Sequence, residues 1–155
     1  MKRIQKLVSM LEFQSKVNDM NNILKRVTDR DIVDGHYTIP DGVTKIGESA
    51  FYECSSLKKI TLPESVAEIG NWAFAGCTSL KKIILPDGVT KIGEGAFYRC
   101  SRLTNITIPG GVTWIGCDAF NRCSSLKKVS LPKKVKLGNY VFRGCHPDLE
   151  IEYRD

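Results

Sequence analysis

Six cysteines and two histidines are the residues of this 155-residue chain whose chemistry could support a metal site or disulfides. Five cysteines are evenly spaced, four at intervals of 23 residues and the last after 22: Cys54, Cys77, Cys100, Cys123 and Cys145. Such spacing predicts a column of parallel side chains whose sulfurs do not point at one another. No CxxC pair occurs, and His36 and His146 lie far apart in the sequence, so no zinc ligand set is indicated. We interpret the five spaced cysteines as small buried hydrophobic residues.

The sixth cysteine, Cys117, stands where other units of the chain carry Glu48, Asn71 and Glu94, so we expect a more exposed thiol. Unpaired thiols are typical of a reducing compartment. The chain contains no GxSxG, GxxxxGK, HExxH or GxGxxG motif, and neither histidine sits in a recognisable catalytic constellation. We therefore expect no catalytic residue, no metal and no cofactor, and a protein that is not an enzyme.

The 23-residue interval extends to residue types that build structure. It recurs in Pro40, Pro63, Pro86, Pro109 and Pro132, in Phe51, Phe74, Phe97 and Phe120, and in Gly47, Gly70, Gly93 and Gly116. The repeated unit can be written [LI]PxxVxxIGxxAFxxCxxLxx[IV]x. A period of this length is the signature of a solenoid, in which each unit makes one circuit and stacks on the next.

Each unit predicts three elements. Polar and apolar residues alternate in 59–62, 82–85, 105–108 and 128–131, which indicates strands that end at the following proline. The VxxIG piece, as in 89–93, indicates a second brief strand. Ala73, Phe74, Cys77 and Leu80 are spaced by one and three residues, which predicts a short helical or 3₁₀ turn with one buried face.

The block LPESVAEIGNWAFAGCTSLKKI at residues 62–83, repeated with small changes from about Ile39 to the C-terminus, resembles the BspA-like, or Treponema pallidum type, leucine-rich repeat family. The resemblance implies an α/β solenoid: a right-handed superhelix of about five 23-residue units with a strand ladder on one side. It also implies a binding scaffold without catalytic residues. Many members are adhesion or recognition modules on bacterial or protozoan surfaces.

Residues 1–31 do not follow the repeat. Apolar residues spaced by three and four, at Ile4, Leu7, Leu11, Phe13, Val17, Met20, Leu24 and Val27, indicate an amphipathic helix. We expect this segment to be a helical cap on a solenoid that occupies 32–155, because a solenoid needs its open apolar end covered. The alternative is a helix whose apolar stripe pairs with a second copy of the chain or with another protein.

The last repeat is altered at both the turn and the strand. It loses one residue between Val135 and Leu137, which shifts the following landmarks to a 22-residue step. If the shift persists, Ile151 and Tyr153 take the inward strand positions, and the outward positions go to Glu150, Glu152 and Arg154.

The outward residues of the strand ladder are the expected binding surface. They are Lys59, Thr61, Lys82, Ile84, Asn105, Thr107, Lys128 and Ser130. Trp72 and Trp114 replace small or charged residues of other units and are added as possible anchors, since tryptophan dominates many interfaces. Packing between units is the alternative role for both. We expect a protein-protein interaction module; the alternatives are a surface or secreted adhesion module for host protein or glycan, and a polyanion binder using the lysine column.

Charge and hydropathy restrict which classes of partner and which cellular compartment we expect. The net charge of +6 is spread along the chain, and the lysine column lacks the interleaved aromatics that stack nucleic-acid bases, which argues against nucleic acid. No apolar run approaches the ~20 residues of a membrane span, so we expect no membrane insertion. The N-terminus does not read as a signal peptide, which predicts a cytoplasmic protein; the cell surface or secretion is the alternative if a longer parent carries an export signal.

Overall fold

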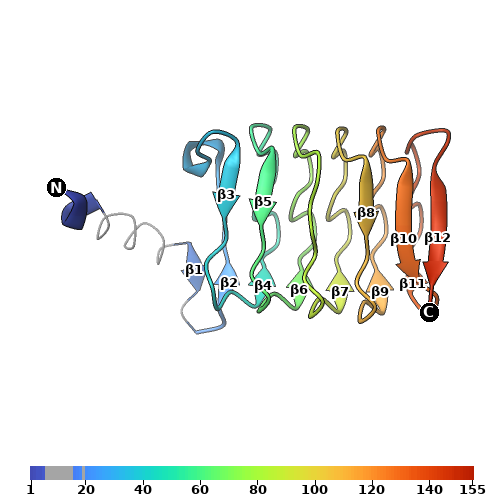
Figure 1. Cartoon of the computed structure of the whole chain (residues 1–155), viewed down its shortest axis with the longest axis horizontal. Coiled ribbons are helices and arrows are strands. Elements are labelled where there is room, and N and C mark those ends of the chain that lie inside the picture. The colour runs from blue at the N-terminus through green and yellow to red at the C-terminus, as the bar shows by residue number, and fades with distance from the viewer. Residues whose placement is uncertain (6–15, 19) are drawn as a thin grey trace.

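A computed structural model describes residues 1–5, 16–18 and 20–155 of the chain. Beyond a helical turn at residues 2–5 and a 3₁₀ helix, η1 (Asp29–Asp31), the regular elements of the described residues are strands joined by tight turns. The turns of the chain stand side by side along the long axis of the molecule (Figure 1). Every described turn except the third contributes one strand to each of two separate ladders, so the repeat unit is one circuit of a β-solenoid.

The first ladder is a seven-stranded sheet of two-residue strands. Their order is β1 (Val17–Asn18), β2 (Ile23–Leu24), β4 (Lys45–Ile46), β6 (Glu68–Ile69), β7 (Lys91–Ile92), β9 (Trp114–Ile115) and β11 (Lys136–Leu137). All neighbouring pairs from β2 onward are parallel. The VxxIG pieces therefore form the second strand expected from the sequence, and the isoleucine of each piece from Ile46 to Ile115 is buried.

The second ladder carries the longer strands and is interrupted. It consists of a two-stranded sheet, β3 (His36–Thr38) with β5 (Lys59–Thr61), and a three-stranded sheet, β8 (Asn105–Thr107), β10 (Lys128–Pro132) and β12 (Glu150–Arg154). All its strand pairs are parallel. Residues 82–85 lie between the two sheets, and the only pairing described for them is an isolated bridge between Lys59 and Lys82. The ladder predicted to run unbroken thus has a gap at its third turn.

The predicted α/β class is wrong for the described residues, which are almost entirely strand and turn. The segment Gly70–Leu80 and its counterparts form consecutive turns, not helices. Trp72 and Gly76 have φ values of +56° and +76°, and these left-handed residues prevent a right-handed helix from continuing. The solenoid has six turns where about five were expected, because the first turn lacks the proline and phenylalanine of the repeat.

The helical cap is not confirmed. The prediction for residues 6–15 and 19 lies outside the described residues, but β1 and β2 form an antiparallel hairpin where the helix was expected to continue. Leu24 and Val27 are buried in the core of the solenoid. Strand β1 covers the first edge of the seven-stranded sheet, and Val17 packs partly against the core. In the described part of the chain, β1 is therefore the edge strand at this end of the sheet.

Identical side chains stack along the interior. The rings of Phe51, Phe74, Phe97 and Phe120 lie parallel, with centroids 5.0–5.3 Å apart. The cysteine column runs beside them, and each thiol donates to a backbone carbonyl of the preceding turn, as Cys100 Sγ does to Phe74 O at 3.1 Å. The same bond recurs for Cys54, Cys77, Cys123 and Cys145. The cysteines are buried or half-buried and unpaired as expected, and they also tie adjacent turns together.

The final turn keeps its register despite the missing residue. Lys91 and Lys136 both pair with Trp114, one 23 residues before it and the other 22 after it. Strand β12 pairs Ile151 with Val129 and Tyr153 with Leu131, which confirms the predicted inward register. These two side chains nevertheless remain 37% and 53% exposed, because no further turn of the described chain covers them.

Among the described residues, no helix is both long and apolar enough to cross a bilayer.

Candidate binding face

The outward residues of the second ladder form what we call the strand face, and the register sets them in two rows. The first row follows the paired positions His36, Lys59, Lys82, Asn105, Lys128 and Glu150. The second row, two residues further along each strand, holds Thr38, Thr61, Ile84, Thr107, Ser130 and Glu152. Since neighbouring strands of a ladder lie about 4.8 Å apart, each row presents one side chain per turn at that spacing.

The structure exposes seven of the eight residues predicted for this face. Lys59, Thr61, Lys82, Ile84, Asn105, Thr107 and Lys128 all point outward and are exposed. Ser130 is the exception, because it is buried, with only 7% of its surface accessible. It lies in the middle of β10, the only strand of this ladder with a five-residue partner and a second partner on its other side. Ser130 is therefore not available to a ligand in this structure.

Positive charge on the strand face is concentrated at the second and third turns. Lys58, Lys59, Lys81 and Lys82 make no ion pair among the described residues. Toward the C-terminal end the charge is offset, since Lys128 Nζ lies 3.9 Å from a carboxylate oxygen of Glu152 and its register partner is Glu150. The two ends of the face are thus electrostatically different.

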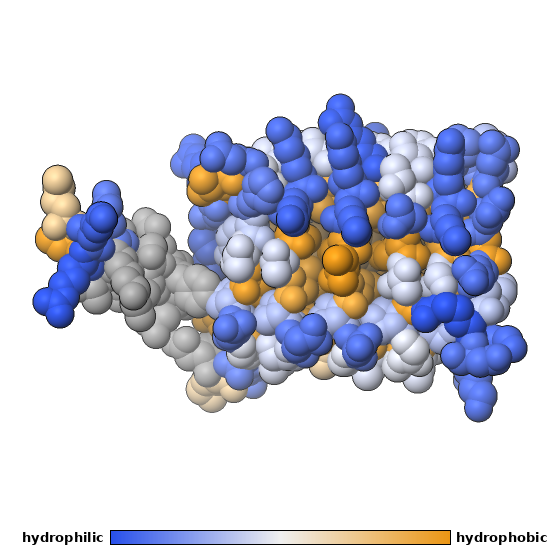
Figure 2. Space-filling model, in the orientation of Figure 1, coloured by the Kyte–Doolittle hydropathy of each residue, from blue (hydrophilic) through white to orange (hydrophobic). Residues whose placement is uncertain are grey.

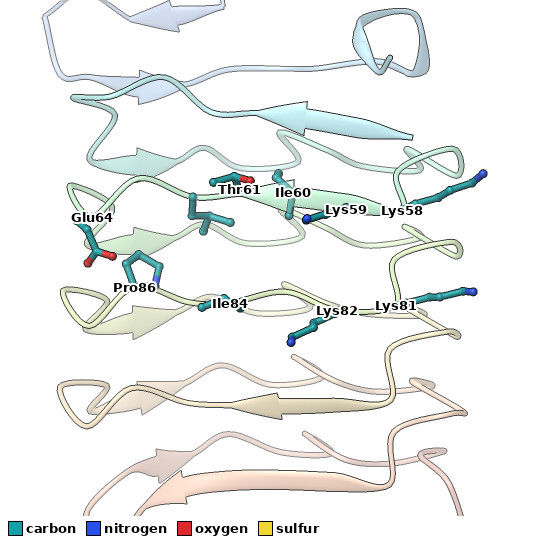
Figure 3. Close-up of a pocket in the computed structure, with 10 residues that line it drawn as sticks. Lys58, Lys59, Ile60, Thr61, Glu64, Lys81, Lys82, Ile84 and Pro86 are labelled. Carbon is teal, nitrogen blue, oxygen red and sulfur yellow. The ribbon is translucent and has the colours of Figure 1, made fainter. Parts of the chain in front are cut away.

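Ile84 occupies the middle of the same region. Its side chain is 70% exposed, whereas the second row carries threonine at the neighbouring turns. A groove of about 510 Å³ separates it from β5 and is lined by Ile60, Thr61, Leu62 and Pro86 together with the four unpaired lysines and Glu64. In the close-up, Lys58 and Lys81 extend away from the strands, while Lys59 and Lys82 lean along the strands toward Ile60 and Ile84 (Figure 3). The groove therefore has an apolar floor beside two flanking ammonium groups.

A second groove of about 440 Å³ lies on the other side of Ile84. Its polar lining consists of Lys82, Asp87, Asn105 and Thr107, and Arg154 of β12 reaches it. The guanidinium of Arg154 donates from Nη2 to the backbone carbonyl of Ile108, two strands away from its own. Figure 2 shows hydrophobic surface across the middle of this face, with long hydrophilic side chains along its upper side.

The two tryptophans do not lie on the strand face. Trp72 sits in the turn segment, half-buried, with its ring edge-to-face against Tyr98 at 5.6 Å, and it covers Gly95 so closely that a Cβ there would overlap the indole. Trp114 lies on β9 of the seven-stranded sheet, between Lys91 and Lys136, and is 38% exposed. Trp72 thus packs between units, and Trp114 is exposed on a different ladder.

The pKa values that burial raises belong to side chains of the core. Burial raises the pKa of the Cys54 and Cys145 thiols to about 11, and it raises those of Cys77, Cys100 and Cys123 further. Burial likewise raises the pKa of Tyr37, which packs on Phe51, to about 12. These groups belong to the core and none lines the two grooves. In the described part of the chain, no group of three or more metal-ligating side chains comes together.

Sequence reasoning found the rows but missed two features of the face. The gap in the ladder at 82–85 has no signal in the repeat pattern, which is as regular there as elsewhere. The reach of Arg154 to Ile108 was also missed, because it depends on the length of one flexible side chain. Ile84 was included among the outward residues, and its apolar character in a polar row was the available clue.

Comparisons with known proteins agree with this architecture. The family described as BspA type leucine-rich repeat region matches residues 35–147 in six copies. A search of curated proteins gave no match.

Several solved structures are similar to this chain. A T. pallidum leucine-rich repeat protein is 38% identical over 87% of this chain and 65% of its own, with a TM-score of 0.77. A leucine-rich cell surface protein of Faecalibacterium prausnitzii is 35% identical over 86% of this chain and 35% of its own, with a TM-score of 0.79. The pneumococcal vaccine antigen PcpA, at 22% identity and a TM-score of 0.75, shares the fold. The chain spans less than two thirds of the length of each of these proteins.

Proposed function

The chain belongs to the BspA-type leucine-rich repeat family, whose members are generally protein-interaction modules, and on this basis we propose that it recognises another protein through the strand face. The observation that carries the proposal is the exposed, mixed surface of Lys59, Lys82, Ile84 and Thr107 on a tightly stacked core. An exposed apolar side chain among hydrogen-bonding and charged ones is typical of an interface centre. No catalytic family is indicated by the comparisons.

Adhesion is a narrower version of the same proposal. The F. prausnitzii relative is described as a cell surface protein, and the two chains are 35% identical. A surface protein that uses the same face would bind a host or neighbouring-cell protein. This version differs from the general one only in where the partner is found.

The test compares two double variants that add the same charge to different surfaces. Thr61→Glu with Thr107→Glu alters the strand face, and Thr78→Glu with Thr90→Glu alters exposed threonines that do not belong to it. Immobilised wild-type protein and both variants are exposed to bacterial and host-cell extracts, and bound proteins are quantified by mass spectrometry. We expect the strand-face variant to lose specific partners that the other retains. Equal retention by both variants contradicts the proposal.

A further inference from the structure

We propose that the strand face binds an extended acidic peptide whose apolar side chains sit against Ile84, in the two grooves beside the gap in the ladder. The inference rests on the proposed protein-binding function and names the chemistry of the partner. It is carried by the coincidence, at the second and third turns, of unpaired positive charge, an exposed apolar side chain and an interrupted ladder.

Charge selects an acidic partner. Lys58, Lys59, Lys81 and Lys82 line the first groove with Glu64 as the one acidic side chain, so the groove is strongly positive. Their lack of ion pairs among the described residues leaves the ammonium groups free to meet carboxylates. By contrast, Glu152 partly offsets the charge of Lys128 on the C-terminal half of the face. A partner steered by this field arrives at the second and third turns.

The exposed side chain of Ile84 favours a partner that also presents an apolar group. Its 70% exposed side chain stands between grooves whose floors include Leu62 on one side and Leu85 on the other. Covering this surface removes apolar area from water, which lysine contacts alone do not achieve. Side chains two residues apart in an extended polypeptide point to the same face. A peptide whose one face carries apolar side chains flanked by acidic ones therefore satisfies both features.

The gap in the ladder gives the site its shape. Residues 82–85 keep only the bridge between Lys59 and Lys82 to the preceding strand, and no strand pairing is described for them on the other side. The first groove is lined by residues of β5 and of this stretch, and the second by residues of this stretch and of β8, so both grooves border the unpaired backbone. Along the rest of the second ladder, strands pair directly. Both grooves thus lie beside the turn that carries Ile84.

A sulfated glycan or a nucleic acid would use the lysines and leave Ile84 in water. The same lysines could attract such a polyanion, but its binding would depend on charge alone and would fall steeply with salt. The apolar ridge between the grooves therefore favours the peptide.

The experiment measures fluorescence anisotropy of a fluorescein-labelled heptapeptide, EELELEE, with the full chain and its variants. Ile84→Thr installs the residue found at the equivalent positions Thr61 and Thr107, so it should fold normally. We expect it to weaken binding about fivefold through lost apolar contact. Lys59→Gln with Lys82→Gln should weaken binding about tenfold. Lys134→Gln, an exposed lysine in the turn between β10 and β11, serves as the matched control and should leave binding unchanged.

A second peptide, EESESEE, separates the sources of affinity. It carries the same charge without apolar side chains and should bind about fivefold more weakly than EELELEE. Equal binding of the two peptides, or no effect of Ile84→Thr, overturns the inference and leaves a polyanion site, which heparin competition at about 50 and 300 mM salt would then reveal. The absence of any EELELEE binding also overturns it. If strand-face variants still lose partners from extracts in that case, the general protein-binding function stands and only the peptide chemistry fails.

Discussion

Replacement of Phe97 by alanine tests whether the stacked phenylalanines stabilise the solenoid. Phe97 is fully buried, and its ring lies parallel to Phe74 at 5.3 Å and to Phe120 at 5.1 Å. Removing a buried phenylalanine costs about 3–5 kcal/mol, and two ring partners place this site toward the upper end of that range. Phe142 has one stacked partner described, Phe120 at 5.8 Å, and is half-buried, so its replacement should cost about half as much.

The assay is urea-induced unfolding followed by circular dichroism, with Phe97→Leu as the comparison that keeps much of the volume but no ring and should cost less than Phe97→Ala. Because each turn contacts only its neighbours, the middle position matters more than the end. Equal losses at Phe97 and Phe142, or a loss below about 1.5 kcal/mol for Phe97→Ala, would refute the idea that stacking between turns supplies the stability.

Three further perturbations follow from other features. Arg99 has a φ of +59°, so Arg99→Gly should raise the free energy of unfolding by about 0.5–1 kcal/mol in thermal melts. Gly76 has a φ of +76°, so Gly76→Ala should lower it. Effects of the same sign would contradict the strain argument. Trp72→Ala should cost about 2 kcal/mol because the indole packs between turns, and Trp114→Ala less than about 1 kcal/mol; the reverse order in urea unfolding would show that their roles are exchanged. Burial raises the pKa of the Cys54 thiol from 9.0 to about 11, so the neutral thiol stabilises the fold below pH 9 and this contribution is lost as pH rises toward 11. Urea midpoints that do not fall between those pH values under reducing conditions would argue against thiol burial.

The core and the register could be predicted from the sequence because they depend on spacing alone. Phenylalanine, cysteine and the isoleucine of VxxIG recur at a constant step, and parallel stacking follows for any residue that does so. Even the irregular step of 22 residues was sufficient to place Ile151 opposite Val129. Identical environments one turn apart leave little freedom for another arrangement.

The helices could not be excluded from the sequence, because spacing by three residues is shared by helices and by consecutive turns. Ala73, Phe74 and Cys77 are buried in either case. The positive φ at Trp72 is what excludes a helix here. A tryptophan in the sequence does not predict this backbone conformation, which is uncommon for bulky residues. In the N-terminal segment, Leu24 and Val27 have helical spacing but take their places in the core through strand pairing with β4 and the turn that follows.

The sequence predicts most of the residues of the strand face, but not the grooves between them. Alternation along the strands correctly pointed Lys59, Lys82 and Ile84 outward, because side chains of a strand alternate between its two faces. The burial of Ser130 was not foreseen, because alternation along β10 places it among the outward residues. The grooves border the unpaired stretch at 82–85. The pattern of side chains along the repeat does not show which strands form backbone hydrogen bonds with their neighbours.

The repeating register also bears on how such a chain changes through evolution. Each turn meets its neighbours through the same backbone and thiol contacts, so recombination between two copies of the repeat can insert or delete one whole circuit without mismatching any bond that remains. The gene can therefore lengthen or shorten the surface by one turn at a time, which adds or removes one side chain in each row. The outward residues of a new turn are free to diverge. A loss of one residue is tolerated directly after Val135, since the preceding turn keeps its bond from Val135 N–H to the Pro132 carbonyl and Lys136 still pairs with Trp114.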